Sequence, residues 1–221
     1  MIKLLRHNEI NKVRWDECVK KSFNGNVYAL SWYLDIVHRN WDALVENDYE
    51  RVMPLTSSKK FGLSYMFQPF FVQQLGVFSS TQLSQETVDN FIKAIPQEYR
   101  LIQYRLNSYN KVNYEADDIV RHRNVELDLI YDYQYLYNNY NNITKRYLGK
   151  AENAGLSIVY DVDPEVIVNL FRNKKKKNVQ HWQDKEYDRL LNLIHTAISY
   201  KCCFTIGIND LENNIIAGAV F

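Results

Sequence analysis

The sequence predicts a mixed α/β (α+β) protein that contains one complete mixed-sheet domain and part of a second. Segments with the two-residue period of strands alternate with segments that have the helical period of about 3.6 residues. Residues 1–125 follow the order strand, helix, helix, strands, helix, strand, and the opening of that order returns after residue 155. We therefore expect a first domain with a linking helix over residues 1–154 and a partial second domain over residues 155–221.

The first domain begins with a short apolar strand and two helices. Trp15, Cys18 and Val19 share one face of the first helix, and Ser31 is expected to cap the second, which runs to Arg39. Further strands and one more helix complete the domain. The strands are expected at residues 2–5, 41–46, 51–56, 60–67, 73–78 and 100–106, and the last helix at residues 84–95.

Turn residues and prolines set the limits of these elements. Asn47-Asp48 tolerates the left-handed backbone region and joins two strands. Pro54 has no amide proton to give to a ladder, which predicts that its strand lies at a sheet edge or bulges at that point. Ser84 opens the last helix of the domain, and Pro96 ends it.

A linking helix is expected before residue 155, followed by a strand. Lys145, Arg146 and Lys150 fall outside its apolar stripe, and Gly155 supplies the left-handed residue that commonly follows a helix. The apolar stripe consists of Leu136, Tyr140, Ile143, Tyr147, Ala151 and Ala154.

The second domain repeats the start of the first. A strand at residues 156–160 is followed by Asp163-Pro164, which opens a helix, and Asp184 is expected to cap another. Strands at residues 204–208 and 215–221 follow, joined by a turn at Asn209-Asp210 or Asn213-Asn214. The pattern then stops.

Residues 125–154 resemble the FemABX-like aminoacyltransferases, in which a strand of the form x-Leu-Asp-Leu precedes a Thr-Arg-x-x-Ile-Arg-Lys-Ala-Glu-like helix between two GNAT-like (acetyltransferase-like) domains. Here that strand is expected at residues 125–130. The resemblance covers roughly 30 residues and departs from the family pattern at Leu148 and Gly149. The matching residues are Leu127-Asp128-Leu129, Thr144, Arg146, Lys150, Ala151 and Glu152.

The resemblance implies a GNAT-like acyl-CoA N-acyltransferase fold and an acyl- or aminoacyltransferase that passes an activated acyl group to an amine. It implies acyl-CoA or aminoacyl-tRNA as donor, and a small-molecule or peptide amine as acceptor. The first domain would build the acceptor cleft, and the second would hold the donor. No cofactor is expected in the chain itself, and the sequence identifies no catalytic residue.

A catalytically silent binding module on the same fold is the alternative. A GNAT-type donor site binds phosphates on backbone amides at a glycine-bearing turn after the fourth strand. In the first domain this turn, residues 79–83, has neither glycine nor arginine, and in the second it would lie beyond Phe221. Neither domain, as given, contains a phosphate loop.

Candidate binding residues gather in two places. Trp32, Tyr33, Tyr65, Gln68 and Gln73 combine aromatic rings with amides, as in the wall of a small-molecule cleft, although core packing with incidental amides explains them equally well.

Arg146 and Lys150 lie one helical turn apart, and the resemblance implies that they clamp a phosphate or carboxylate of a nucleotide-linked acceptor. A solvated helix face, paired with Glu152 or Asp128, is the alternative that the residues favour. The lysine run at residues 174–177 suits tRNA phosphates or a solvated helix end. His181 is the one histidine placed as a candidate general base.

Composition excludes several classes of function. A net charge of +1 gives no general electrostatic reason to bind DNA, RNA or an anionic membrane. Three cysteines supply neither a disulfide framework nor the spacing of metal ligands. The N-terminus lacks the apolar run of a signal peptide and no apolar run of 18 residues occurs, so a cytoplasmic protein is expected.

The last strand, residues 215–221, is apolar throughout apart from one glycine, the pattern of a strand buried on both faces. It lacks the lysines, prolines and bulges that protect natural sheet edges. We therefore expect that a further segment of about 60 to 100 residues completes the second domain, or that a homodimer covers this strand.

Overall fold

The computed structural model describes residues 1–113, 119–173 and 182–221. The chain divides into two compact units, Met1–Asn124 and Val125–Phe221, which are treated separately below. The sequence placed the boundary at residue 154, whereas the contacts group residues 125–154 with the second unit. The lysine run at 174–177 and His181 lie outside the described residues.

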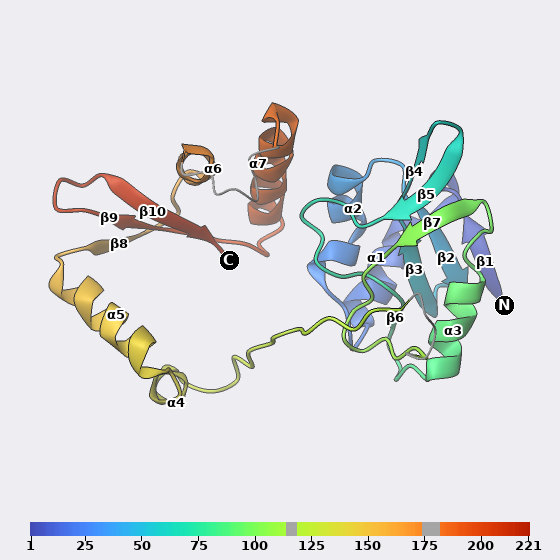
Figure 1. Ribbon diagram of the computed structural model, residues 1–221, viewed down its shortest axis with the longest axis horizontal. Helices are drawn as coiled ribbons and strands as arrows, with labels where there is room; N and C mark the ends of the chain where they lie inside the picture. Colours follow the sequence, from blue (N-terminus) through green and yellow to red (C-terminus); the bar gives the residue numbers. More distant parts are fainter. Residues whose placement is uncertain (114–118, 174–181) are drawn as a thin grey trace. The chain divides into compact units, whose positions relative to one another are not determined.

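The first unit contains a four-stranded sheet in the order β1-β2-β3-β6, and every neighbouring pair is antiparallel (Figure 1). Two helices and two short 3-10 turns connect its first two strands. These elements are β1 (Ile2–Leu5), η1 (His7–Glu9), α1 (Lys12–Lys21), η2 (Val27–Ala29), α2 (Ser31–Val37), β2 (Asp42–Glu46), β3 (Arg51–Leu55) and β6 (Phe78–Ser79).

Helix α1 forms as the sequence predicts. The Asn11 side chain accepts the Arg14 amide at 3.2 Å, and Trp15, Cys18 and Val19 are buried. Trp15 packs on Trp41 with ring centroids 4.7 Å apart, so the apolar face of α1 holds the helix to the start of β2.

Helix α2 differs from the prediction at both ends. Leu30 is its N-cap residue, and the helix ends at Val37 rather than Arg39. Ser31 is the first helical residue, and its amide and hydroxyl both donate to Asp16, each at 2.7 Å. The cap prediction was wrong because a carboxylate from α1, distant in sequence, takes the role that Ser31 was expected to play.

Pro54 lies where the sequence predicts, at a point where β3 is an edge. It faces Ala43 of β2 on one side, whereas on the other side β6 pairs only with Arg51 and Val52. The missing amide proton of Pro54 therefore breaks no ladder.

The strand expected at residues 60–67 is a hairpin. Strands β4 (Ser57–Lys60) and β5 (Leu63–Phe67) are joined by Phe61 and Gly62, which have φ values of 50° and 79°. Two successive positive φ angles are the signature of the type I′ turn that matches strand twist. With β7 (Tyr99–Gln103), which runs parallel to β5, the hairpin forms a second sheet, so the unit has two small sheets instead of the single mixed sheet expected.

Helix α3 (Gln85–Lys93) supplies the main core of the first unit. Ser84 caps it, accepting the Thr87 amide at 3.1 Å. Its buried residues Val88 and Phe91 pack with Leu44, Met53 and Tyr99 in one apolar cluster that joins both sheets. Burial of such side chains is the largest favourable contribution to folding, at about 1.5–3 kcal/mol each.

The strand expected at residues 73–78 is mostly irregular, and buried asparagine amides replace its missing ladder. Asn110 accepts the Val77 amide at 2.7 Å and donates to the Val77 carbonyl at 3.0 Å, while Asn24 donates to the same carbonyl at 2.8 Å. Asn107 donates to the Leu75 carbonyl at 3.0 Å. The strand pairing of this segment with the chain after β7 is limited to an isolated parallel bridge between Leu75 and Leu106. The sequence predicted that the two segments pack near each other, and they do so mainly through the asparagine side chains.

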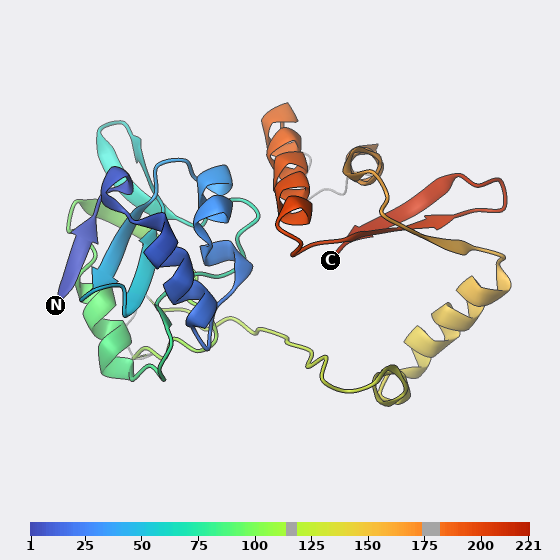
Figure 2. The ribbon, with the colours of Figure 1, turned by 180° about the vertical axis from the view of Figure 1, so that it is seen from behind.

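The second unit contains a three-stranded antiparallel sheet in the order β10-β9-β8, with α6 and α7 on the same side of it (Figure 2). The linking helix expected before residue 155 is two helices, separated where Asn141 caps the second. The elements are α4 (Tyr133–Asn138), α5 (Asn142–Asn153), β8 (Ser157–Tyr160), α6 (Pro164–Asn173), α7 (Asp184–Ser199), β9 (Thr205–Asn209) and β10 (Ile215–Val220).

Most boundaries of this unit follow the sequence. Gly155 adopts φ 66°, Pro164 begins α6, and Asn213 takes the left-handed region in the turn between β9 and β10. Helix α7 is capped by Gln183 rather than Asp184. The strand expected at residues 125–130 is absent: this segment is irregular, and Val125 and Ile130 are 84% and 88% exposed.

Strand β10 is an outer strand of the sheet β10-β9-β8. The expectation of a bulge-free strand buried on both faces was wrong: its residues are partly or fully exposed, and its pairing with β9 shifts register between Ile215 and Ala217. One face packs against α6, where Gly218 allows Ile167 to approach closely. The other face of the sheet carries Ile158 and Tyr160, which are 61% and 65% exposed. No helix in the described part of the chain has the length and hydrophobicity that crossing a bilayer requires.

We expect Asn110→Ala to destabilise the first unit by about 2 kcal/mol, because it leaves the buried amide of Val77 without an acceptor. Gly76→Ala should also destabilise, since Gly76 has φ 112° and an added Cβ would lie 2.2 Å from the Asn110 Oδ1. Chemical denaturation measures both effects. Asn90→Ala, an exposed site on α3, is the matched control, and equal effects of N90A and N110A would contradict the role of the amide.

Candidate functional site

The aromatic and amide residues expected to line a cleft lie on α2, β5 and the connection after β5. Tyr33 is buried on α2, and its hydroxyl donates to the Phe71 carbonyl at 2.5 Å. Burial raises the pKa of the Tyr33 phenol far above its usual range, so this group stays protonated and remains a donor. Trp32 packs edge-on against Tyr33, with ring centroids 5.4 Å apart.

Gln68 and Tyr65 continue this region. The Gln68 amide accepts the Arg105 backbone amide at 3.1 Å and donates to the Val72 carbonyl at 3.3 Å. Tyr65 packs against Phe67, and Gln73 is exposed. Tyr33 and Gln68 therefore use their polar atoms to hold the backbone of residues 68–72, which is a structural role.

Arg146 and Lys150 project from the exposed surface of α5. The helix begins where Asn141 accepts the Thr144 amide at 2.8 Å. The Arg146 guanidinium lies 5.5 Å from the ring centre of Tyr147, and the Lys150 ammonium lies 5.9 Å from the same ring. Within the described residues neither cation forms an ion pair with a carboxylate. The structure brings the two cations together around one aromatic ring, on the exposed surface of α5.

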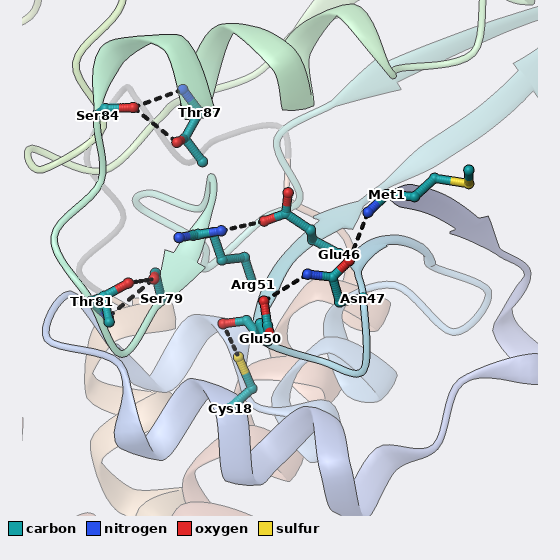
Figure 3. A network of polar contacts seen from close by, with 10 residues as sticks. All are labelled: Met1, Cys18, Glu46, Asn47, Glu50, Arg51, Ser79, Thr81, Ser84 and Thr87. Carbon is teal, nitrogen blue, oxygen red and sulfur yellow. Dashed lines mark hydrogen bonds and ion pairs between the residues drawn. The ribbon is translucent and has the colours of Figure 1, made fainter.

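The turn between β6 and α3 is the position at which a GNAT-type phosphate loop was sought. Figure 3 shows that it is lined with hydroxyl groups: Ser79 accepts the Thr81 amide at 3.1 Å, and Ser84 accepts the Thr87 amide at 3.1 Å. These two amides are therefore already satisfied by the protein. A phosphate at this turn would have to displace hydroxyl groups of the chain itself.

Arg51 is a charged group near this turn that sequence reasoning missed. It lies opposite Ser79 in the pairing of β3 with β6, and its guanidinium forms an ion pair with Glu46 at 2.5 Å (Figure 3). The residue was missed because only the register of two strands, far apart in sequence, brings it to the turn. The signal in the sequence that could have identified Arg51 is its position at the start of the strand that pairs with the turn.

A cavity of about 240 Å³ lies between α1 and the turn that joins β2 to β3. Arg14 pairs with Asp48 and lies over the Tyr49 ring, and Lys21 lies 3.9 Å from Glu17, so these charges of the wall largely neutralise one another. Cys18 is also in the wall, but burial raises the pKa of its thiol and keeps it protonated. A protonated thiol is a poor nucleophile.

A second cavity, of about 280 Å³, lies in the second unit where β8 leads into α6. Its wall includes Asp161, Asp163, Phe204 and Cys203. Asp163 accepts the Glu165 amide at 2.9 Å and so stabilises the start of α6. None of the predicted cleft or anion-binding residues lines either of these two cavities.

Comparisons with protein-family models, with curated proteins and with solved structures find no match to this chain.

We expect Ser84→Ala to lower the free energy of unfolding by about 1 kcal/mol, because the Thr87 amide loses its cap, and Ser84→Gly to cost less. Urea denaturation measures the difference. Gln85→Ala, at the exposed first residue of α3, is the control. If Ser84→Ala unfolds at the wild-type urea concentration, the hydroxyl does not occupy the amide as described.

Proposed function

We propose that the chain is a GNAT-like, FemABX-related acyl- or aminoacyltransferase, which passes an activated acyl group to an amine. One observation carries the proposal: both units contain the same succession of elements in the same sheet order. The first unit begins with one strand, two helices and two strands (β1, α1, α2, β2 and β3), and its strands pair in the order β1-β2-β3. The second unit has the same succession (β8, α6, α7, β9 and β10), and its strands pair in the order β8-β9-β10. A repeated unit of this kind supports the two-domain arrangement that the residues around Arg146 suggest.

The chemistry requires little of the protein beyond alignment of the reactants. The amine nitrogen attacks the carbonyl carbon of an ester or thioester, the carbonyl oxygen takes up the electron pair, and the alcohol or thiol then leaves with the proton that the amine gives up. Positioning two reactants supplies a large part of such rate enhancements, about 7–11 kcal/mol in favourable cases. No described side chain is assigned a catalytic role.

The donor, acyl-CoA or aminoacyl-tRNA, carries phosphates that need cationic partners. Within this proposal Arg146 and Lys150 bind them, because both are exposed and neither is neutralised by a carboxylate of the described chain. The acceptor is a small-molecule or peptide amine. The cytoplasmic location and a homodimer that covers β10 belong to the same proposal.

A catalytically silent binding module on the same fold is the second candidate. The turn between β6 and α3 favours it, since the Ser79 and Ser84 hydroxyls occupy amides that a phosphate loop would leave free. A silent module would bind the donor or the acceptor without turnover.

We expect the protein to transfer a labelled acyl group from acyl-CoA or aminoacyl-tRNA to a primary amine. Chromatography of the labelled product measures this transfer. The Arg146→Ala/Lys150→Ala double variant should lower kcat/KM about 100-fold, because two charge-assisted contacts to the donor are lost. The thermal stabilisation that the donor gives to the wild type should disappear in the same variant.

The double variant Lys20→Ala/Lys111→Ala, which removes two exposed lysines of the first unit, is the control for charge. Donor binding without product would favour the silent module. If neither donor binds or reacts, the proposed function is wrong.

A further inference from the structure

Helices α4 and α5, together with Tyr131 just before the α4 N-cap, carry four strongly exposed tyrosines. Tyr131, Tyr133, Tyr135 and Tyr147 are 51%, 65%, 51% and 58% exposed. Tyr131 and Tyr135 already stack on one another, with ring centroids 4.4 Å apart and planes 25° from parallel. Aromatic faces held open to solvent are surfaces on which a further flat ring can stack.

Cations accompany these rings. The Lys145 ammonium lies 5.5 Å from the ring centre of Tyr137 and donates to the Asn138 carbonyl at 2.9 Å. Arg146 and Lys150 flank the Tyr147 ring. Lys145, like the other two, forms no ion pair with a carboxylate in the part of the chain that the structure describes.

No acidic residue of the two helices forms an ion pair with these cations in the described part of the chain. Asp132 accepts the Tyr135 amide at 2.7 Å and so serves as the cap of α4. Glu152 lies two residues after Lys150, a step that turns it about 200° around the helix axis and away from that lysine. Arg146 and Lys150 are exposed and Lys145 is partly exposed; the charge of Arg146 and Lys150 is the more accessible to a ligand.

We propose that the tyrosine–cation surface, defined as Tyr131, Tyr135, Tyr147, Lys145, Arg146 and Lys150, binds single-stranded nucleic acid. Phosphates contact the three cations, and unpaired bases stack on the tyrosine rings, the combination by which sequence-independent single-strand binders work. The near-neutral charge of the whole chain argues against duplex binding over a wide basic face, but not against a local site that also uses stacking. The inference goes beyond acyl transfer: it shares Arg146 and Lys150 with the proposed donor site and adds Lys145 and the tyrosines, and binding of a single strand requires no transfer.

Fluorescence anisotropy with labelled oligonucleotides of about 12 nucleotides tests the surface. Oligo(U), oligo(A) and the corresponding single-stranded DNA should bind, whereas a blunt duplex of the same length should not, because its bases are stacked within the helix. For three neutralised phosphates the logarithm of the binding constant should fall against the logarithm of salt concentration with a slope of about −2. Binding of RNA but not DNA would show that the sugar hydroxyl is also recognised.

Variants separate stacking from charge. Tyr147→Ala should weaken binding about tenfold with an unchanged salt slope, and Tyr147→Phe should bind as the wild type does. Arg146→Ala should make the salt slope less steep by about 0.7. Tyr160→Ala, at a similarly exposed tyrosine on β8, is the control.

Three results would overturn the proposal: no binding of any single strand at low salt, equal binding of the duplex, or displacement of oligo(U) by inorganic polyphosphate combined with no effect of Tyr147→Ala. The last result would mean that charge attraction alone, without stacking of bases, accounts for the binding. Acyl transfer from acyl-CoA without any oligonucleotide binding would leave the proposed function intact and reject this surface. Oligonucleotide binding without transfer would support this surface and count against the transferase.

Discussion

The backbone of Val77 is the point on which the first unit depends. Its amide and carbonyl are buried between two sheets, where β6 is too short to pair with them. Asn24 and Asn110, from segments before β2 and after β7, meet there and supply the hydrogen bonds that a strand would have supplied. Two distant segments of the chain are thereby fixed to the backbone of one residue, and α3 can follow β6 in a defined direction over the apolar core.

Local patterns were sufficient where neighbours in sequence determine the structure. The face of α1 that carries Trp15 and the start of α6 at Pro164 need only helical period and a first-position proline. Residues 60–67 were read as one strand because Phe61 is apolar, although Gly62 beside it permits the turn. The segment at residues 73–78 has the composition of a strand, but its partners are side chains, which no periodicity reveals.

The sequence indicates which residue types are candidates for a binding site, but not which groups their polar atoms bind in the folded chain. Tyr33 and Gln68 do lie together, yet the backbone of residues 68–72 takes up their polar atoms. Arg51 reaches the turn after β6 only through strand register, and the exposure of the tyrosines of α4 does not follow from the sequence pattern. Sequence shows which groups are present, whereas burial and pairing decide which remain free to meet a ligand.

The amides that organise the first unit also limit its chemical lifetime. Asn24 precedes Gly25, the sequence in which a backbone nitrogen most readily attacks an asparagine side chain and converts it to aspartate. In the folded chain the Gly25 amide donates to the Ser22 carbonyl at 3.0 Å, and the Asn24 side chain is fixed on Val77 and Ser79, so the two reacting atoms are held apart. Ageing will therefore proceed through the unfolded fraction, and each event will place a carboxylate against a buried carbonyl and prevent that molecule from refolding.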